Sequence, residues 1–323
     1  MSRLSYVNGR YVPHEEAVIP LEDRGFQFGD GVYIVMAVYA GRLIDLDAHV
    51  DRLAGYGKDI QVSLPFDPEI VKATCREVVR RNRGTEGSLY VQLTRGVAPR
   101  QHAFPDEGAR PSLVMVYKHQ AIHLDAENLL CVNVITTPDI RWKRPHIKAT
   151  SLLPTVLLRQ QAKEAGAFDT WLLDENENIC EGASSNAYIV TDQGVIVTRP
   201  QDGSLVPGVT RARLLMLAKE LDIPVEERAF SKEEAKNARE AFLSGALSMV
   251  KSVVRIDGRP VGTGAPGPVT RRLAQCYFDY CRGTLPITAS HVVIPGPKKI
   301  KAAVSKTRPL KKNIQEGSWS LAS

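Results

Sequence analysis

The sequence predicts a two-domain protein of the α+β class. The chain has 323 residues, a length that can bury one or two hydrophobic cores. Short apolar runs typical of strands alternate with helical patterns in both halves of the chain. Residues 120–130 form a plausible linker. We therefore expect a smaller N-terminal α+β domain at residues 1–119 and a larger domain at residues 131–285.

The first strands of the N-terminal domain are expected in a hairpin at residues 4–12. Asn8 and Gly9 lie between its two apolar runs, and this pair favours a tight turn. Further strands of the domain are expected at residues 32–39, 43–44, 88–94 and 112–119.

Two helices are expected between these strands. Asp47 can cap a first helix that carries Arg52. Asp67 followed by Pro68 is a typical start for a second helix, and Gly84 can end it.

The second domain is expected to be richer in strands. Ser231 and Glu234 have the spacing of a capping box, which indicates a helix start. Strands are expected at residues 132–136, 170–173, 187–191, 195–198, 241–243 and 250–261. Helices are expected at residues 154–165, 211–221 and 269–280.

The positive charge is confined to the end of the chain. Residues 286–323 contain seven basic residues and one acidic residue, which accounts for the whole formal charge of +6. The first 285 residues are therefore neutral and show no footprint for nucleic acid. The lysine-rich tail, which lacks periodicity, is expected to be disordered. It is either a solvated extension or a segment that binds RNA or an acidic surface.

Several protein classes are excluded by composition. No stretch approaches 18 consecutive apolar residues, so we expect no membrane span. The start of the chain carries His14, Glu15 and Glu16 where a signal peptide would be apolar. The five cysteines form no CxxC pair and no metal-like group, so we expect no metal site and a reducing, cytoplasmic location.

The most informative chemistry joins a lysine to an acidic motif. Lys148 lies about thirty residues before the run Glu181-Gly182-Ala183-Ser184-Ser185-Asn186. A lysine amine can form a Schiff base with the aldehyde of pyridoxal 5'-phosphate, and a carboxylate can keep the pyridine nitrogen protonated. The pair therefore predicts a pyridoxal-phosphate enzyme.

The wider pattern is similar to that of a known family. Asn186 and Tyr188 are followed by Ile196-Val197-Thr198 and by residues 206–211, and this arrangement resembles the signature of the class IV pyridoxal-phosphate aminotransferases. Within that class, residues 23–33 and 90–102 look like D-amino-acid aminotransferases. The resemblance covers residues 4–284 and implies their two-domain α+β fold with the cofactor in the cleft between domains.

The resemblance implies a role for each matching residue. Lys148 would form the Schiff base and move the proton between Cα and the cofactor C4′ carbon, and Glu181 would hold the pyridine nitrogen. Residues 209 and 210 open a helix whose free N–H groups can cradle a phosphate. The full cofactor-binding set is Arg52, Lys148, Glu181, Ser185, Asn186, Val209 and Thr210.

Substrate choice is assigned to Tyr33, Arg100 and His102, with Tyr90 nearby. Residues two apart in an extended segment project to the same side, so Arg100 and His102 can converge on one carboxylate. The resemblance implies that both reach into the site of a partner subunit, which makes a homodimer the working unit. The implied substrates are D-alanine and 2-oxoglutarate, giving pyruvate and D-glutamate.

The chain departs from the family at three positions. Related enzymes usually place Glu where this chain has Ile34, and often place hydroxyl residues where it has Ala246 and Leu247. Phosphate contacts at that turn would then fall to backbone N–H groups or to Ser244 and Ser248.

Other functions stay open. A branched-chain L-amino-acid aminotransferase and an aminodeoxychorismate lyase share the fold, and a non-catalytic RNA-binding module would use the tail. Residues 262–267 match the pattern GxGxxG, which is either a dinucleotide site or a turn that starts a helix. Their place after the Asp257-Gly258 hairpin, and Pro266 among them, favour the turn.

Overall fold

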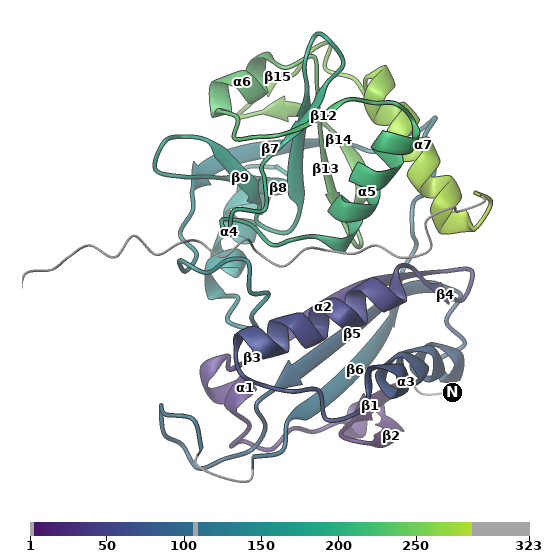
Figure 1. The fold of residues 1–323 in the computed structure, drawn as a ribbon, viewed down its shortest axis with the longest axis vertical. Coiled ribbons are helices and arrows are strands. Elements are labelled where there is room, and N and C mark those ends of the chain that lie inside the picture. The colour runs from purple at the N-terminus through teal and green to yellow at the C-terminus, as the bar shows by residue number, and fades with distance from the viewer. Residues whose placement is uncertain (1–2, 106–108, 286–323) are drawn as a thin grey trace, which may run out of the picture.

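The computed structural model describes residues 3–105 and 109–285. These residues form two sheets of different size, with helices packed on each (Figure 1). Both sheets mix with helices as expected for the α+β class. The tail predicted for residues 286–323 lies outside the described residues.

The N-terminal half contains a six-stranded sheet in which every neighbouring pair is antiparallel. The order across it is β2-β1-β6-β5-β3-β4. Its strands are β1 (Leu4–Val7), β2 (Arg10–Pro13), β3 (Gly31–Tyr39), β4 (Arg42–Leu43), β5 (Glu86–Thr94) and β6 (Ser112–His119). Asn8 and Gly9 adopt positive φ angles of 46° and 94°, which confirms the hairpin turn.

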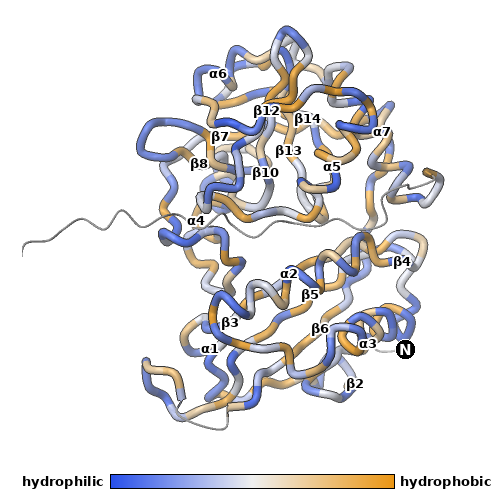
Figure 2. Tube along the Cα trace, viewed as in Figure 1, coloured by the Kyte–Doolittle hydropathy of each residue, from blue (hydrophilic) through white to orange (hydrophobic). Residues whose placement is uncertain are grey.

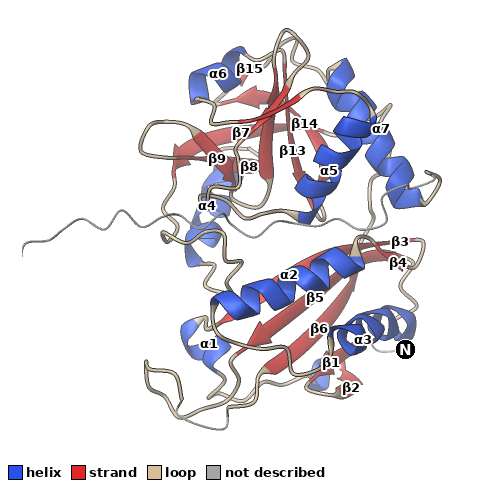
Figure 3. Cartoon of the chain, in the orientation of Figure 1, coloured by secondary structure: helices blue, strands red, loops and turns tan. Residues whose placement is uncertain are grey.

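Helices cover one face of this sheet (Figure 3). The long ones are α2 (Leu46–Asp59) and α3 (Pro68–Arg81), whose buried faces share one apolar core with β1, β3, β5 and β6. A short helix, α1 (Arg24–Phe28), and a 3-10 turn, His14–Glu16, were not predicted.

The predicted cap of α2 is wrong. The N-cap residue is Asp45, and Asp47 lies in the first turn and pairs with Lys72 at 2.9 Å. The Asp45 carboxylate makes no capping bond, because it accepts hydrogen bonds from Arg213 and Tyr280, each at 2.6 Å. Both donors lie more than 160 residues away in the chain, so the sequence around Asp45 cannot predict them.

The C-terminal half contains a nine-stranded mixed sheet. Its order is β12-β11-β10-β13-β14-β7-β8-β9, with β15 paired to β14. The strands are β7 (Cys131–Pro138), β8 (Asp169–Leu173), β9 (Ile179–Gly182), β10 (Asn186–Val190), β11 (Ile196–Thr198), β12 (Val225–Glu227), β13 (Glu240–Gly245), β14 (Met249–Ile256) and β15 (Arg259–Pro260).

Four helices pack against this sheet: α4 (Leu153–Glu164), α5 (Val209–Glu220), α6 (Lys232–Asn237) and α7 (Pro268–Arg282). Ser231 caps α6 by accepting from the Glu234 N–H at 3.0 Å, as predicted. The turn at residues 262–267 ends at Gly267, the N-cap of α7. The first N–H groups of α7 already bond to the buried Glu240 carboxylate, so this turn is a helix start rather than a phosphate cradle.

Apolar residues concentrate inside both halves, while several loops also carry exposed apolar residues (Figure 2). The predicted linker, residues 120–130, contains no helix or strand, and its buried members pack into a core of the C-terminal half. Helix α2 runs along the face that meets that half, where Ala48 contacts Val209 (Figure 1). The two halves therefore meet along α2 and the first turn of α5, and also at Ala37 and Ile44, which share a core with the C-terminal half. The predicted domain boundaries stay a prediction.

Candidate active site

A cavity of about 320 Å³ lies where the two halves meet. Its walls come from β3 and α2 on one side and from the loops around β9, β13 and α5 on the other. The polar and charged residues that line it are Tyr33, His49, Arg52, Tyr56, Arg141, Lys148, Thr155, Glu181, Ser184, Ser185, Asn186, Thr210, Ser244 and Ser248. All seven residues predicted to bind the cofactor are among its lining residues.

Lys148 is held by backbone bonds to a strand of the other half. The Tyr33 N–H donates to the Lys148 carbonyl at 3.0 Å, and the Thr150 N–H donates to the Gly31 carbonyl at 2.9 Å. Val32 and Ala149 form the bridge between these bonds. This short antiparallel pairing places the Lys148 Nζ 4.7 Å from the centre of the Tyr33 ring. The lysine amine therefore sits at a fixed point against an aromatic wall of the cavity.

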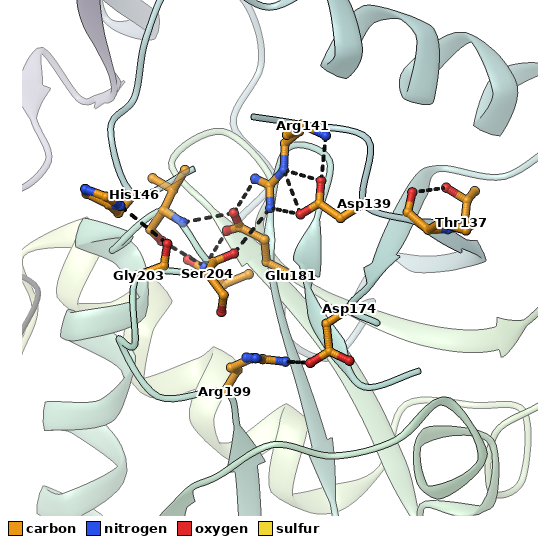
Figure 4. A network of polar contacts seen from close by, with 12 residues as sticks. Thr137, Asp139, Arg141, His146, Asp174, Glu181, Arg199, Gly203 and Ser204 are labelled. Carbon is orange, nitrogen blue, oxygen red and sulfur yellow. Dashed lines mark hydrogen bonds and ion pairs between the residues drawn. The ribbon is translucent and has the colours of Figure 1, made fainter. Parts of the chain in front are cut away.

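Glu181 is buried at the end of β9 and accepts three hydrogen bonds, which leaves acceptor capacity for one more donor. Its carboxylate accepts from Arg141 Nη1 at 2.6 Å, from Asn186 Nδ2 at 3.0 Å and from the Val206 N–H at 2.9 Å. Figure 4 shows Arg141 between Glu181 and Asp139. The Arg141 Nη2 lies 2.8 Å from the Asp139 carboxylate. Burial raises the pKa of the Glu181 carboxyl, and the contacts with Arg141 oppose that rise. Sequence reasoning missed Arg141, because its partner lies 40 residues away.

Arg52 has an unused hydrogen-bonding group. Its Nη2 is buried without a hydrogen-bond partner among the described residues. Burial lowers the pKa of this guanidinium, which is the cost of holding a cation out of water. An anion in the cavity would satisfy both the charge and the donor.

The start of α5 supplies further donors to the same cavity. Val209 and Thr210 form its first turn, where backbone N–H groups have no partner within the helix. A Cβ on Gly208, the N-cap, would lie 2.2 Å from the Asn186 Oδ1, so only glycine permits this close approach. Together with Arg52, this geometry fits a phosphate group.

Ser185 and Asn186 hold two acidic side chains of the site in place, Asp169 and Glu181. The Ser185 hydroxyl donates to the buried Asp169 at 2.7 Å, and Asn186 bonds to Glu181. Ser244 lines the cavity, but its hydroxyl pairs with the Tyr188 hydroxyl at 2.8 Å. The departures Ala246 and Leu247 also line the cavity, at the turn between β13 and β14.

His49 was missed as a cavity residue. It lies one turn before Arg52 on α2, and the two face the same cavity. Burial lowers the pKa of its imidazole to about 4, with Lys148 and Arg52 adding to the shift and Asp45 opposing it. Its ring is therefore neutral at physiological pH. The spacing of three between His49 and Arg52 was the available sequence signal.

The predicted substrate residues are separated in space. Tyr33 lines the cavity and stacks on Tyr90, with ring centres 5.4 Å apart. Arg100 and His102 are exposed and do not line the cavity of their own chain. Both lie instead against Phe28, at 5.1 Å and 5.6 Å from its ring centre. A single chain thus brings the lysine, the acid and the tyrosine together but leaves the two cationic side chains outside.

Two negative findings concern the described residues alone. Within residues 3–105 and 109–285 there is no group of histidine, cysteine and acidic side chains that could hold a metal ion. None of the helices described is long and apolar enough to cross a membrane.

Comparison with known proteins matches the amino-transferase class IV family at residues 31–256. A D-alanine aminotransferase of Bacillus licheniformis is 40% identical over 266 residues, which cover 82% of this chain and 93% of that protein. One of Staphylococcus haemolyticus is 37% identical over 276 residues, covering 85% and 96%.

Solved structures agree with this match. A branched-chain amino acid aminotransferase of Escherichia coli superposes with a TM-score of 0.80 at 26% identity, covering 94% of this chain and 98% of that one. A branched-chain aminotransferase of the thermophilic archaeon Thermoproteus uzoniensis, solved with norvaline, superposes with a TM-score of 0.77 at 25% identity, covering 88% and 96%.

Proposed function

Because this chain belongs to the class IV aminotransferases, we propose that it transfers amino groups between D-amino acids and 2-oxo acids, with D-alanine and 2-oxoglutarate as substrates. The products would be pyruvate and D-glutamate. The D-alanine aminotransferases, at 37–40% identity over most of the chain, support this substrate class. The observation that carries the chemistry is the shared cavity of Lys148, Glu181 and the unpartnered Arg52 nitrogen.

Class IV aminotransferases use pyridoxal phosphate, and the cavity fits it at both ends. Arg52, Val209 and Thr210 would hold the phosphate, and Glu181 would face the ring nitrogen. When bound, the cofactor supplies an aldehyde that takes up the amino group and a ring that draws electrons from the substrate Cα.

The residues of the chain then divide the work. Lys148 would be the covalent attachment point and would move the proton at the substrate Cα through its Nζ. An ionised carboxylate favours a positive charge beside it, and the contacts with Arg141 favour the ionised form of Glu181, so Glu181 would keep a proton on a ring nitrogen placed against it. Arg141 holds Glu181 at 2.6 Å and keeps that carboxyl in place. Tyr33 closes the cavity beside the amine.

We propose further that the working unit is a homodimer. Arg100 and His102 lie outside the cavity of their own chain, so a substrate carboxylate that uses these two donors must receive them from another chain. A second copy of the chain would supply them. Mixing Lys148→Ala chains with Arg100→Ala chains tests this, because only a mixed dimer combines one intact cavity with one intact arginine. Recovery of about a quarter or more of the wild-type rate is expected from random pairing, and no recovery in a confirmed mixed dimer would reject the shared site.

A branched-chain L-amino-acid aminotransferase is the second candidate, and the solved structures at 25–26% identity favour it. A donor panel separates the two functions. Purified enzyme with 2-oxoglutarate should form pyruvate from D-alanine faster than it forms 2-oxo acids from L-leucine or L-valine. A preference for the L-amino acids would overturn the proposal.

A further inference from the structure

The segment that carries Arg100 and His102 has few bonds of its own. We call residues 97–104 the arm. The last backbone bond that holds it runs from the Ala98 N–H to the Glu22 carbonyl at 3.3 Å. Beyond that point, within the described residues, the hydrogen bonds to arm carbonyls come from one side chain, Arg24.

Arg24 holds the arm at two successive carbonyls. Its Nη1 donates to the Gln101 carbonyl at 2.6 Å, and its Nη2 donates to the His102 carbonyl at 3.3 Å. Its Nε donates to Asp30 at 2.8 Å. The Arg24 side chain is only 3% exposed, although residues 99–104 of the arm are exposed. The planar guanidinium thus uses all three of its nitrogens, one toward the anchor and two toward the arm.

Asp30, the anchor of Arg24, is itself fixed from the other side. Arg95 donates to it from Nε at 2.7 Å and from Nη2 at 3.1 Å, and also bonds to the Ile60 and Gln61 carbonyls. Burial would raise the pKa of the Asp30 carboxyl, but the two arginines lower it below its usual range. The anchor therefore stays ionised between two cations.

Phe28 supports the side chains of the arm. It lies one turn after Arg24 on α1, and its ring contacts the Arg24 guanidinium at 4.8 Å. Arg100 and His102 lie against the same ring. At the far end of the arm, the Arg95 guanidinium lies 3.6 Å from the centre of the Phe104 ring. The backbone and the side chains of the arm are thus held in place by Arg24, Arg95 and Phe28.

We propose that Arg24 is a positioning residue that fixes the arm and thereby sets recognition of the substrate α-carboxylate. This inference rests on the proposed function, because the arm selects substrate only if Arg100 and His102 bind that carboxylate. Arg24 lies outside the cavity and does not line it. Loss of the Arg24 side chain should therefore weaken binding of the substrate carboxylate and leave the chemistry at the substrate Cα unchanged.

The first test needs no substrate. Arg24→Ala removes the anchor, and Arg24→Lys keeps a charge beside Asp30, so that the chain folds, but cannot reach both carbonyls. The control is Arg271→Ala, because Arg271 makes the same kind of contact, to the Ala126 and Glu127 carbonyls, away from the arm. Amide hydrogen exchange at Gly96 and Ala98, whose N–H groups make bonds at the start of the arm, should speed up in both Arg24 variants and stay unchanged in the control. Unchanged exchange in the Arg24 variants would overturn the inference.

The second test separates positioning from general damage. For cofactor-loaded enzyme, kcat/KM for D-alanine should fall by about 10- to 100-fold in both Arg24 variants. D-alaninol keeps the same Cα but carries an alcohol in place of the carboxylate. Its kcat/KM should therefore change by less than about threefold in the Arg24 variants. If turnover of D-alaninol is slow, single-turnover kinetics give this value. Equal losses for both donors would show a merely structural role and overturn the inference.

The two proposals can fail separately. A wild-type enzyme that uses D-alanine no faster than L-amino acids would refute the proposed function. The exchange measurement would still decide whether Arg24 holds the arm, since it depends on no substrate.

Discussion

The buried histidine beside Lys148 should make the stability of the enzyme depend on pH. In the folded chain, burial lowers the pKa of His49 from 6.5 to about 4. The unfolded chain therefore binds a proton at a pH where the folded chain does not, and stability falls as pH drops from 6.5 toward 4. The two pKa values differ by about 2.5, which corresponds to about 3 kcal/mol over the whole range.

Urea unfolding of the cofactor-free protein measures this effect, because bound cofactor would add its own stabilisation. From about pH 7 to about pH 5, wild type should lose about 2 kcal/mol more free energy of unfolding than His49→Gln. His123→Gln is the control, since His123 is exposed on the segment between the two halves, and it should keep the wild-type slope. Parallel slopes for wild type and His49→Gln would refute the reasoning.

Three substitutions test the rest of the site. Arg141→Leu leaves the buried Glu181 unpaired and should lower the free energy of unfolding in urea by about 3–5 kcal/mol, whereas Lys143→Ala, which breaks an exposed pair, should change it by less than about 0.5 kcal/mol. Lys148→Ala should abolish the borohydride-reduced cofactor adduct in peptide mass spectrometry. An adduct on another lysine would show that Lys148 is not the residue that binds the cofactor covalently. Arg100→Ala should lower kcat/KM for D-alanine by about 100-fold with an unchanged cofactor Kd; an unaltered kcat/KM would reject carboxylate binding.

Features set by neighbouring residues were predictable from the sequence. The Asn8-Gly9 hairpin, the Ser231 cap and the helix that starts at Val209 each depend on a few adjacent residues, and the structure confirms them. The seven residues expected to bind the cofactor line one cavity, as the family resemblance implies, and their binding of the cofactor stays a prediction.

Features set by distant residues were not predictable. Arg141, His49 and Arg24 owe their environment to burial and to partners far along the chain, so their local sequence resembles that of any surface arginine or histidine. The cap of α2 was misassigned for the same reason, since Asp45 is engaged by residues of the other half. Helix α1 has five residues, too few for a periodic pattern.

The pairing of residues 148–150 with β3 attaches the backbone of the catalytic-site lysine to the N-terminal half of the chain. Lys148 comes after β7 in the chain, yet its carbonyl accepts a hydrogen bond from Tyr33 in the N-terminal half, and Thr150 donates one to Gly31 there. Glu181 belongs to the opposite sheet. The amine and the carboxylate are therefore held by different halves of the chain, and the distance between them depends on how the two halves pack.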